Sequence, residues 1–438
     1  MNRSDKERLA RRQRMLARER GEEPGAVSGT SGDVGLRTPR HLRRDAPQPP
    51  PEPDGARVQA IDPRAHLKKD QRRRHAFWGV LLLAAAAAVW VLTGAFADSL
   101  VLLGDVTDTL TIYLNHNGSW PANTGITTPL QIEALGGGFV ELDNRDVVVF
   151  SPTGGKIRAF QPGYARPTLA AGRSHFVVYN RAGTELRVES RTRTLYTRTT
   201  EDPLLLCAMS ANGTLAVVTE SSRYAAELTV YDPAFRELLC WQMTGSEGTP
   251  IAVRFASDNR RFAVGTLAAR DGQLSSRIYL MDLRGDDQPV YNATTGSLLL
   301  RLQWLTADRL LAIFDNYLAV LNAADMTELV RYDITGGTLQ SAAVQGRHIA
   351  LLVQLRGGCT LMTMDETLTP LAEIPAGQAT GLTAGATGVY LLSAGRVQFF
   401  GYDGVQKWEQ QYDTSPLAVL ETDKTLVFAG AKAEVLEQ

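Results

Sequence analysis

Histidine and cysteine are the side chains of this 438-residue chain that could bind a metal or act as nucleophiles. The six histidines are His41, His66, His75, His116, His175 and His348. No two of them stand at metal-ligand spacing, and zinc needs three or four converging ligands. The sequence also lacks a phosphate loop, a dinucleotide fingerprint and a G-x-S-x-G elbow. We therefore predict no catalytic residue, no metal ligand and no cofactor.

The three cysteines, Cys207, Cys240 and Cys359, also do not predict a disulfide framework. Cys207 falls on a predicted innermost strand, and Cys240 falls on the outermost strand of the same structural unit. Three strand spacings separate them by roughly 14 Å, whereas a disulfide needs Cα atoms within about 7 Å. We expect no disulfide between them, and we expect all three to be small core residues.

One type of short apolar strand recurs eight times after residue 98, at intervals of 36 to 48 residues. A unit of about 40 residues with four strands is the blade of a β-propeller. The eight strands are Phe139–Leu142, Phe176–Tyr179, Leu215–Thr219, Phe262–Thr266, Leu310–Phe314, Ile349–Val353, Val389–Leu392 and Thr425–Phe428.

Residues 204–243 show the order of elements within one unit. An innermost strand, Leu204–Met209, is followed by the turn Ser210–Gly213, in which Asn-Gly supplies a positive φ. A second buried strand follows at Leu215–Val218. A third strand runs over Leu228–Tyr231, and an outer strand over Leu238–Trp241. This order predicts an all-β, WD40-like β-propeller, although the missing Trp-Asp dipeptide disfavours the large propeller class that carries it.

The last unit, Leu417–Leu436, is too short to supply four strands. A propeller must join its two ends, because an open sheet edge is an aggregation hazard. We expect Thr109–Leu114 to supply the missing outer strand, which gives eight blades. Seven blades, with the terminal strands paired differently, is the alternative.

The run Ala76–Ala97 contains 22 residues without a charge and directly follows a basic cluster that ends at Arg74. As a helix it would reach roughly 33 Å, enough to cross a bilayer. We predict a transmembrane helix over 76–97, a cytoplasmic tail over 1–75 and an extracytoplasmic domain over 98–438. The expected membrane anchor residues are Phe77, Trp78, Leu81, Leu82, Leu83, Val89, Trp90 and Phe96.

Charge sets the expected orientation. Residues 1–75 hold 19 Lys and Arg against 11 Asp and Glu, and the rest of the chain holds 27 against 36. Basic residues beside a span stay on the cytoplasmic side, so the propeller domain is expected outside the cell membrane. Ala95-Phe96-Ala97 has the form of a signal-peptide cleavage site, and cleavage there is the alternative. Residues 21–60 are rich in Gly, Pro and Arg and are expected to be disordered.

Three groups of motifs resemble an uncharacterised family of single-pass, propeller-bearing proteins of clostridial-type Firmicutes, classed as a domain of unknown function. These motifs are Asn117–Pro121, the strand Asp146–Phe150 with Gly154–Ile157 after it, and Ala208–Gly213 with Tyr224 and Val230–Asp232. The resemblance implies a bacterial surface protein with a quinoprotein-like propeller, and it implies no catalytic residues.

Three functions remain open from the sequence. A protein-interaction or envelope scaffold is favoured, with the lipid bilayer and an envelope or surface protein as partners. The net negative charge of the domain disfavours nucleic acid, and no small-molecule ligand is expected. The alternative is a hydrolase or quinone-dependent dehydrogenase at the channel mouth, which a cluster of carboxylates there would favour. A sensor module is a third reading.

Overall fold

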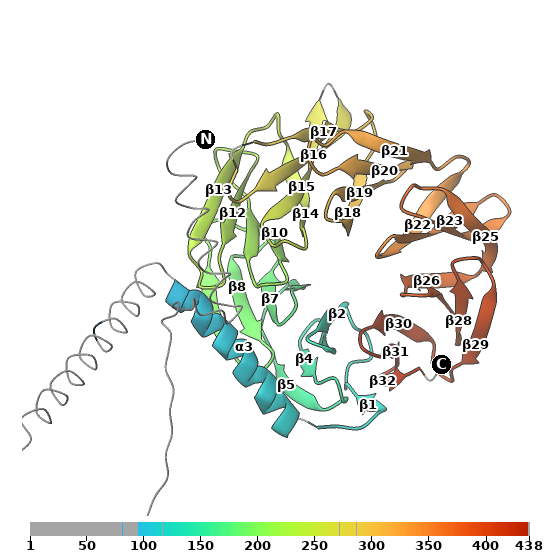
Figure 1. The fold of residues 1–438 in the computed structure, drawn as a ribbon, viewed down its shortest axis with the longest axis horizontal. Coiled ribbons are helices and arrows are strands. Elements are labelled where there is room, and N and C mark those ends of the chain that lie inside the picture. The colour runs from blue at the N-terminus through green and yellow to red at the C-terminus, as the bar shows by residue number, and fades with distance from the viewer. Residues whose placement is uncertain (1–80, 82–94, 116, 271, 286, 437–438) are drawn as a thin grey trace, which may run out of the picture. The chain divides into compact units, whose positions relative to one another are not determined.

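The computed structural model describes residue 81 and residues 95–115, 117–270, 272–285 and 287–436, with the side chains of the first helix described from Gly104 onward. These residues form eight four-stranded antiparallel sheets arranged as blades around one axis (Figure 1). In seven blades the strands follow one another in sequence order from the axis outward. The innermost strands of neighbouring blades contact each other, and β30 contacts β2 to close the ring.

Blades 1 to 4 are consecutive in the chain. Blade 1 contains β2 (Gln131–Leu135), β3 (Gly138–Leu142), β4 (Val147–Phe150) and β5 (Lys156–Phe160). Blade 2 contains β6 (Pro167–Ala171), β7 (His175–Asn180), β8 (Glu185–Ser190) and β9 (Thr194–Thr199). Blade 3 contains β10 (Leu204–Met209), β11 (Leu215–Thr219), β12 (Ala226–Tyr231) and β13 (Glu237–Met243). Blade 4 contains β14 (Thr249–Phe255), β15 (Arg261–Arg270), β16 (Gln273–Asp282) and β17 (Val290–Asn292).

Blades 5 to 8 complete the ring. Blade 5 contains β18 (Leu299–Thr306), β19 (Arg309–Phe314), β20 (Tyr317–Asn322) and β21 (Glu328–Asp333). Blade 6 contains β22 (Gly337–Gln345), β23 (His348–Leu355), β24 (Gly358–Met364) and β25 (Pro370–Gly377). Blade 7 contains β26 (Ala379–Ala384), β27 (Gly388–Ser393), β28 (Arg396–Gly401) and β29 (Gln406–Gln411). Blade 8 contains β30 (Pro416–Glu421), β31 (Thr425–Ala429), β32 (Lys432–Val435) and β1 (Ala122–Asn123).

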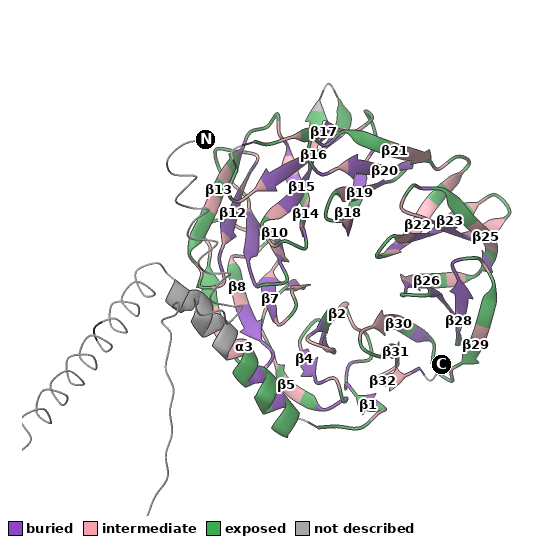
Figure 2. Cartoon of the chain, in the orientation of Figure 1, coloured by how far each residue is buried: buried purple, intermediate pink, exposed green. Residues whose placement is uncertain are grey.

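The apolar core lies between the blades. Eight clusters of buried side chains fill the eight interfaces between neighbouring blades. The second and third strands are largely buried because both of their faces pack on adjacent sheets, whereas the outer strands alternate or are exposed (Figure 2). All eight recurring apolar strands of the sequence are the second strands of their blades, which confirms the repeat and the eight-bladed propeller.

The predicted closing strand is wrong. Thr109–Leu114 belongs to helix α3 (Ala95–Asn115), and blade 8 is completed instead by β1. Ala122 pairs with Ala433 and Asn123 with Lys432, and the Thr124 amide donates to the Ala431 carbonyl at 2.9 Å. A two-residue strand is too short to show a periodic apolar pattern. The sequence therefore could not indicate that β1 pairs with β32.

Two hairpins within blade 1 have clear local causes. Gly136–Gly138 form the hairpin between β2 and β3. A Cβ at residue 138 would lie 2.1 Å from the Phe150 carbonyl oxygen, so only glycine fits that position. The Asp143 carboxylate accepts the amides of Arg145 and Asp146 and so holds the turn between β3 and β4.

Most of the expected membrane anchor lies outside the described residues, namely Phe77, Trp78, Leu82, Leu83, Val89 and Trp90. Leu81 is helical and exposed, and Phe96 lies in helix α3. Of the helical residues that the structure describes, none belongs to a helix with the length and hydrophobicity of a membrane span. The expected tail, residues 1–75, also lies outside the described part of the chain.

Candidate functional site at the junction of helix α3 and blade 2

Helix α3 lies along the outside of the propeller, where it crosses blades 1 and 2 (Figure 1). Its inward face carries Asp105, Asp108 and Ile112, which are three and four residues apart and therefore share one side of the helix. Asp108 and Ile112 are buried, and Asp105 is half-buried. Two of the three inward residues are acidic, so the helix is fastened to the propeller largely by polar contacts.

Asp105 is the central acceptor of this junction. Its Oδ1 lies 2.9 Å from His175 Nε2, and its Oδ2 accepts a hydrogen bond from Ser174 Oγ at 2.9 Å. Ser174 and His175 stand at the start of β7, where the β6–β7 hairpin reaches the helix. Both side chains bond to the carboxylate and no hydrogen bond is found between them, so they do not form a nucleophile–base relay.

The hairpin between β8 and β9 supplies the second set of contacts. Arg191 is buried, and its Nη2 donates to Thr109 Oγ1 at 2.5 Å and to the Asp105 carbonyl at 3.4 Å. The Thr192 hydroxyl donates to Asp108 Oδ1 at 2.5 Å. One guanidinium and two carboxylates therefore meet at the helix, and each makes at least one hydrogen bond, although the buried Arg191 Nε has no partner among the described residues.

The surroundings of His175 favour its neutral form. Burial lowers the pKa of this imidazole, and Arg191 acts in the same direction, while Asp105 and Asp108 oppose the shift. The imidazole remains neutral near pH 7 and can donate from Nε2 to Asp105, a role that fixes position rather than moves protons.

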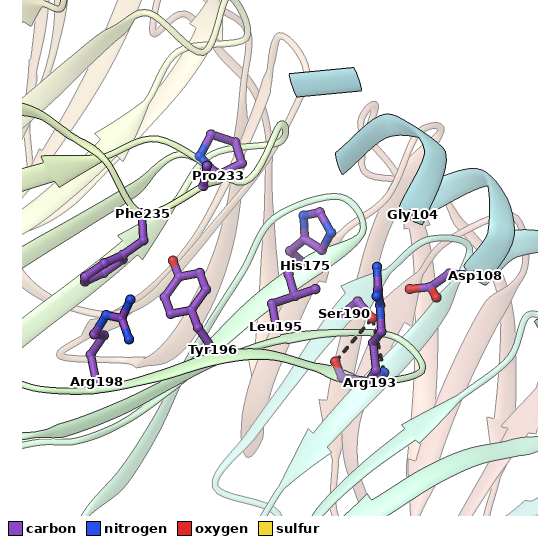
Figure 3. A pocket seen from close by; sticks show the side chains of 11 residues that line it. Gly104, Asp108, His175, Ser190, Arg193, Leu195, Tyr196, Arg198, Pro233 and Phe235 are labelled. Carbon is purple, nitrogen blue, oxygen red and sulfur yellow. Dashed lines mark hydrogen bonds between the residues drawn. The ribbon is translucent and has the colours of Figure 1, made fainter. Parts of the chain in front are cut away.

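A pocket of about 350 Å³ opens beside this junction, between the helix, blade 2 and the outer turn of blade 3 (Figure 3). Gly104 and Asp108 line it from the helix, and His175 from blade 2. Gly104 allows close approach here, because a Cβ at that position would lie 2.8 Å from Arg193 Nη2.

The far wall of the pocket is aromatic and cationic. Tyr196 and Phe235 rings lie 4.8 Å apart, and the Arg198 guanidinium sits 4.7 Å from the Phe235 ring centroid. The buried Tyr196 hydroxyl has no hydrogen-bond partner in the described part of the chain, and burial raises its pKa. Two arginines, Arg193 and Arg198, line this volume. Such a wall suits an anionic group attached to a flat apolar body.

Phe235 owes its place to a turn used in several blades. It has a φ of 61°, as Met326 has 59° and Leu368 has 58° at corresponding turns between third and fourth strands. Met326 and Leu368 are buried between blades, whereas Phe235 is half-buried and lines the pocket. Asp232 holds the blade 3 turn by accepting the amides of Ala234 and Arg236.

Charged residues also lie on innermost strands, near the axis of the ring. Glu133 comes from blade 1, Arg254 from blade 4 and Arg301 from blade 5. Desolvation raises the pKa of Glu133, and the two arginines oppose that shift. Within the described residues, no group of three or more His, Cys, Asp and Glu is arranged to hold a metal ion. Glu133 with these two arginines does not make the carboxylate cluster that would favour an enzyme.

The cysteine predictions are partly confirmed. Cys207 and Cys240 lie on the innermost and outermost strands of blade 3 as expected, and all three cysteines are free. Cys207 and Cys359 are buried, but Cys240, on the outermost strand β13, is exposed. The partner of His175, Asp105, is 70 positions away in the chain, so no local spacing indicated the pair.

A scan against protein families matches residues 113–435 to a family of unknown function, DUF5711. The chain belongs to this family. The match confirms the resemblance to an uncharacterised family, and it begins within helix α3, so the DUF5711 region comprises the end of that helix and the whole propeller. No curated protein matches the chain.

Solved propellers resemble the DUF5711 structure in fold. BamB from Moraxella catarrhalis is 13% identical, with 73% of this chain and 98% of that chain covered and a TM-score of 0.50. The C-terminal WD40 domain of Sif2 is 12% identical, with 73% of this chain and 95% of that chain covered and a TM-score of 0.50. The computationally designed Ika8 protein is 12% identical, with 73% of this chain and 98% of that chain covered and a TM-score of 0.50. At these identities the likeness concerns the fold alone.

Proposed function

We propose that this chain is a single-pass membrane protein of clostridial-type Firmicutes whose propeller, outside the cytoplasm, serves as a protein-interaction or envelope scaffold. The observation that carries the proposal is the junction of helix α3 with blade 2. Helix α3 begins at Ala95, inside the apolar run Ala76–Ala97, and its inward face is held by buried polar contacts. A propeller fixed to the segment that leaves the bilayer would present its blades and loops in a defined orientation.

The chemistry of the described residues supports a scaffold over a catalyst. Ser174 and His175 both bond to Asp105 instead of forming a relay, and Glu133 on the innermost strand of blade 1 is accompanied by the two arginines Arg254 and Arg301. The basic excess of residues 1–75 supports the cytoplasmic placement of the N-terminus.

Membrane retention tests the anchoring. The full-length chain should remain with the membrane fraction after high-salt washing, and a Leu82→Arg, Leu83→Arg double variant should move into the soluble fraction, because charges at the bilayer centre oppose insertion. Leu238→Arg on the exposed outer strand of blade 3 is the matched control and should stay with the membrane. Wild-type protein that is freely soluble after gentle lysis would refute the anchoring.

Crosslinking in intact cells tests the scaffold. A reproducible envelope or surface protein should be captured through the propeller, and protease added outside intact cells should cut residues 98–438 while sparing the tail. Digestion of the tail alone would reverse the orientation. Turnover of a sugar or an alcohol by the purified protein, with no partner captured, would establish the enzyme instead.

A further inference from the structure

An ordinary surface helix packs its apolar face on the protein and exposes its polar face to solvent. Helix α3 does the reverse. Its inward face is the acidic one described above, and its outward face is apolar. Four outward side chains are strongly exposed: Val106 at 65%, Leu110 at 57%, Tyr113 at 75% and Leu114 at 63%. At 100° per residue these four lie within one third of the helix circumference, opposite Asp105, Asp108 and Ile112. We call these four residues the outer stripe.

The ring does not need this stripe, because all eight blades are paired and β1 closes blade 8. An exposed apolar stripe of this kind is typical of a surface that binds a partner or a membrane. The helix that carries it is held on the opposite side by buried charges, so rotation of the stripe inward would leave Asp105 and Asp108 without their partners.

The spacing of the stripe identifies the kind of surface that covers it. Val106, Leu110 and Tyr113 are four and three residues apart, which is the spacing of a coiled-coil seam. The seam positions in the sequence of α3 are Phe96, Ser99, Leu103, Val106, Leu110 and Tyr113. The neighbouring described positions on this side, Thr107 and Thr109, are uncharged, so two identical faces can meet without repulsion.

We propose that the outer stripe pairs with the same stripe of a second copy of this chain, in a parallel coiled coil with the two propellers on opposite sides. This adds a partner to the scaffold proposed above and rests on it in one respect: anchors in one membrane hold two copies parallel, as an in-register seam requires. On that placement, Val106 to Leu114 lie about 13 to 25 Å beyond Ala97 along the helix, past the headgroup layer, which favours a protein over lipid as the covering surface.

Self-association of the full-length chain in detergent micelles tests the pairing, separately from membrane retention in cells. Sedimentation should show a dimer for the wild type. A Leu110→Glu, Tyr113→Glu double variant should weaken dimerisation at least about 100-fold, because two apolar pairs are lost and like charges are opposed. Thr111→Glu, which places a charge on the same helix outside the stripe, should remain a dimer. Circular dichroism of the propeller should be unchanged in both variants.

Cysteine crosslinking then tests the register. In a Cys240→Ser background, oxidation should join two copies of Leu110→Cys, and it should not join Thr111→Cys. Wild-type protein that stays monomeric in micelles, or a dimer that survives Leu110→Glu with Tyr113→Glu, would overturn the proposal. Monomers that bind vesicles of phosphatidylglycerol through the stripe would overturn it in favour of a lipid-covered helix.

Discussion

The segment before the first blade contacts the propeller in two places, and the two contacts have opposite chemistry. Helix α3 is held on blade 2 by carboxylates, hydroxyls, a histidine and an arginine. Strand β1, a few residues later, joins blade 8 by backbone pairing, above a core that contains Phe139, Phe150 and Phe428. Closure of the ring depends on burial of apolar area, whereas docking of the helix depends on matched polar groups. The two should therefore respond differently to mutation and to pH.

The largest effect is expected at the closure. Phe428 is buried at the interface of blades 8 and 1, where its ring packs edge-on against Phe139 with the two ring centroids 5.0 Å apart. Phe428→Ala should lower the free energy of unfolding by about 3–5 kcal/mol, since both transfer energy and packing are lost. Leu238→Ala, on an exposed outer strand, should change it by about 0.5 kcal/mol or less. Urea titration measures the free energy of unfolding of both variants. If Phe428→Ala and Leu238→Ala lower it equally, burial of Phe428 does not stabilise the closure.

A buried acid beside the closing strand gives the next effect. Glu141 on β3 is buried, its Oε2 has no hydrogen-bond partner among the described residues, and desolvation raises its pKa to about 7, against the hydrogen bond from Thr124. As pH rises from 4.5 toward 7, the unfolded chain releases this proton before the folded chain does, so stability falls. Glu141→Gln should remove that slope and add about 1–3 kcal/mol at pH 8.

The exposed Glu373→Gln on β25 is the control for that measurement and should leave the pH dependence as it is in the wild type. Urea titrations at pH 4.5 and pH 8 give the slope for each protein. A Glu141→Gln protein that keeps the wild-type slope would show that this carboxyl does not control the closure.

The sequence predicted the closure and the helix to different extents. The eight second strands were found because both faces of each are buried, so an uninterrupted apolar run must appear in every blade. Strand β1 was missed because two residues carry no pattern, and its position is set by pairing with β32. Helix α3 was missed because its buried face is acidic and its exposed face apolar, the reverse of the usual signal.

The pocket was also beyond prediction from spacing. Gly104, His175 and Phe235 come from a helix and two different blades, and only the folded ring brings them together. Asp232 holds the turn of blade 3 through local contacts, but the half-buried position of Phe235 depends on the neighbouring Tyr196, which no local pattern indicates.

A smaller and more local effect is expected at the helix junction. Asp105→Ala removes the acceptor of both Ser174 and His175 and should destabilise docking of α3 by about 1–2 kcal/mol. Hydrogen exchange of the helix amides should accelerate about 5- to 30-fold, while the amides of β31 and β32 should exchange as in the wild type, because the helix can open without opening the ring. Thr111→Ala, on an exposed position, should change neither. Faster exchange in β31 would show that the two contacts are coupled.

The smallest effect is the response of the helix to acid, and its sign is opposite to that of the closure. Burial, with Arg191, lowers the pKa of His175 below 6.5 in the folded chain, so the neutral imidazole contributes its full stabilisation above about pH 6.5. That contribution is lost as pH falls from 6.5 toward the folded pKa, because the unfolded chain takes up the proton first. Helix amides should therefore exchange faster at pH 5 than at pH 7.5, after correction for intrinsic rates, and His175→Gln should abolish the difference. A helix that is better protected at pH 5 would mean that Asp105 and Asp108 outweigh desolvation at this imidazole. The expected result would mean that the closure at β1 loses stability as pH rises, whereas the docking of α3 loses stability as pH falls.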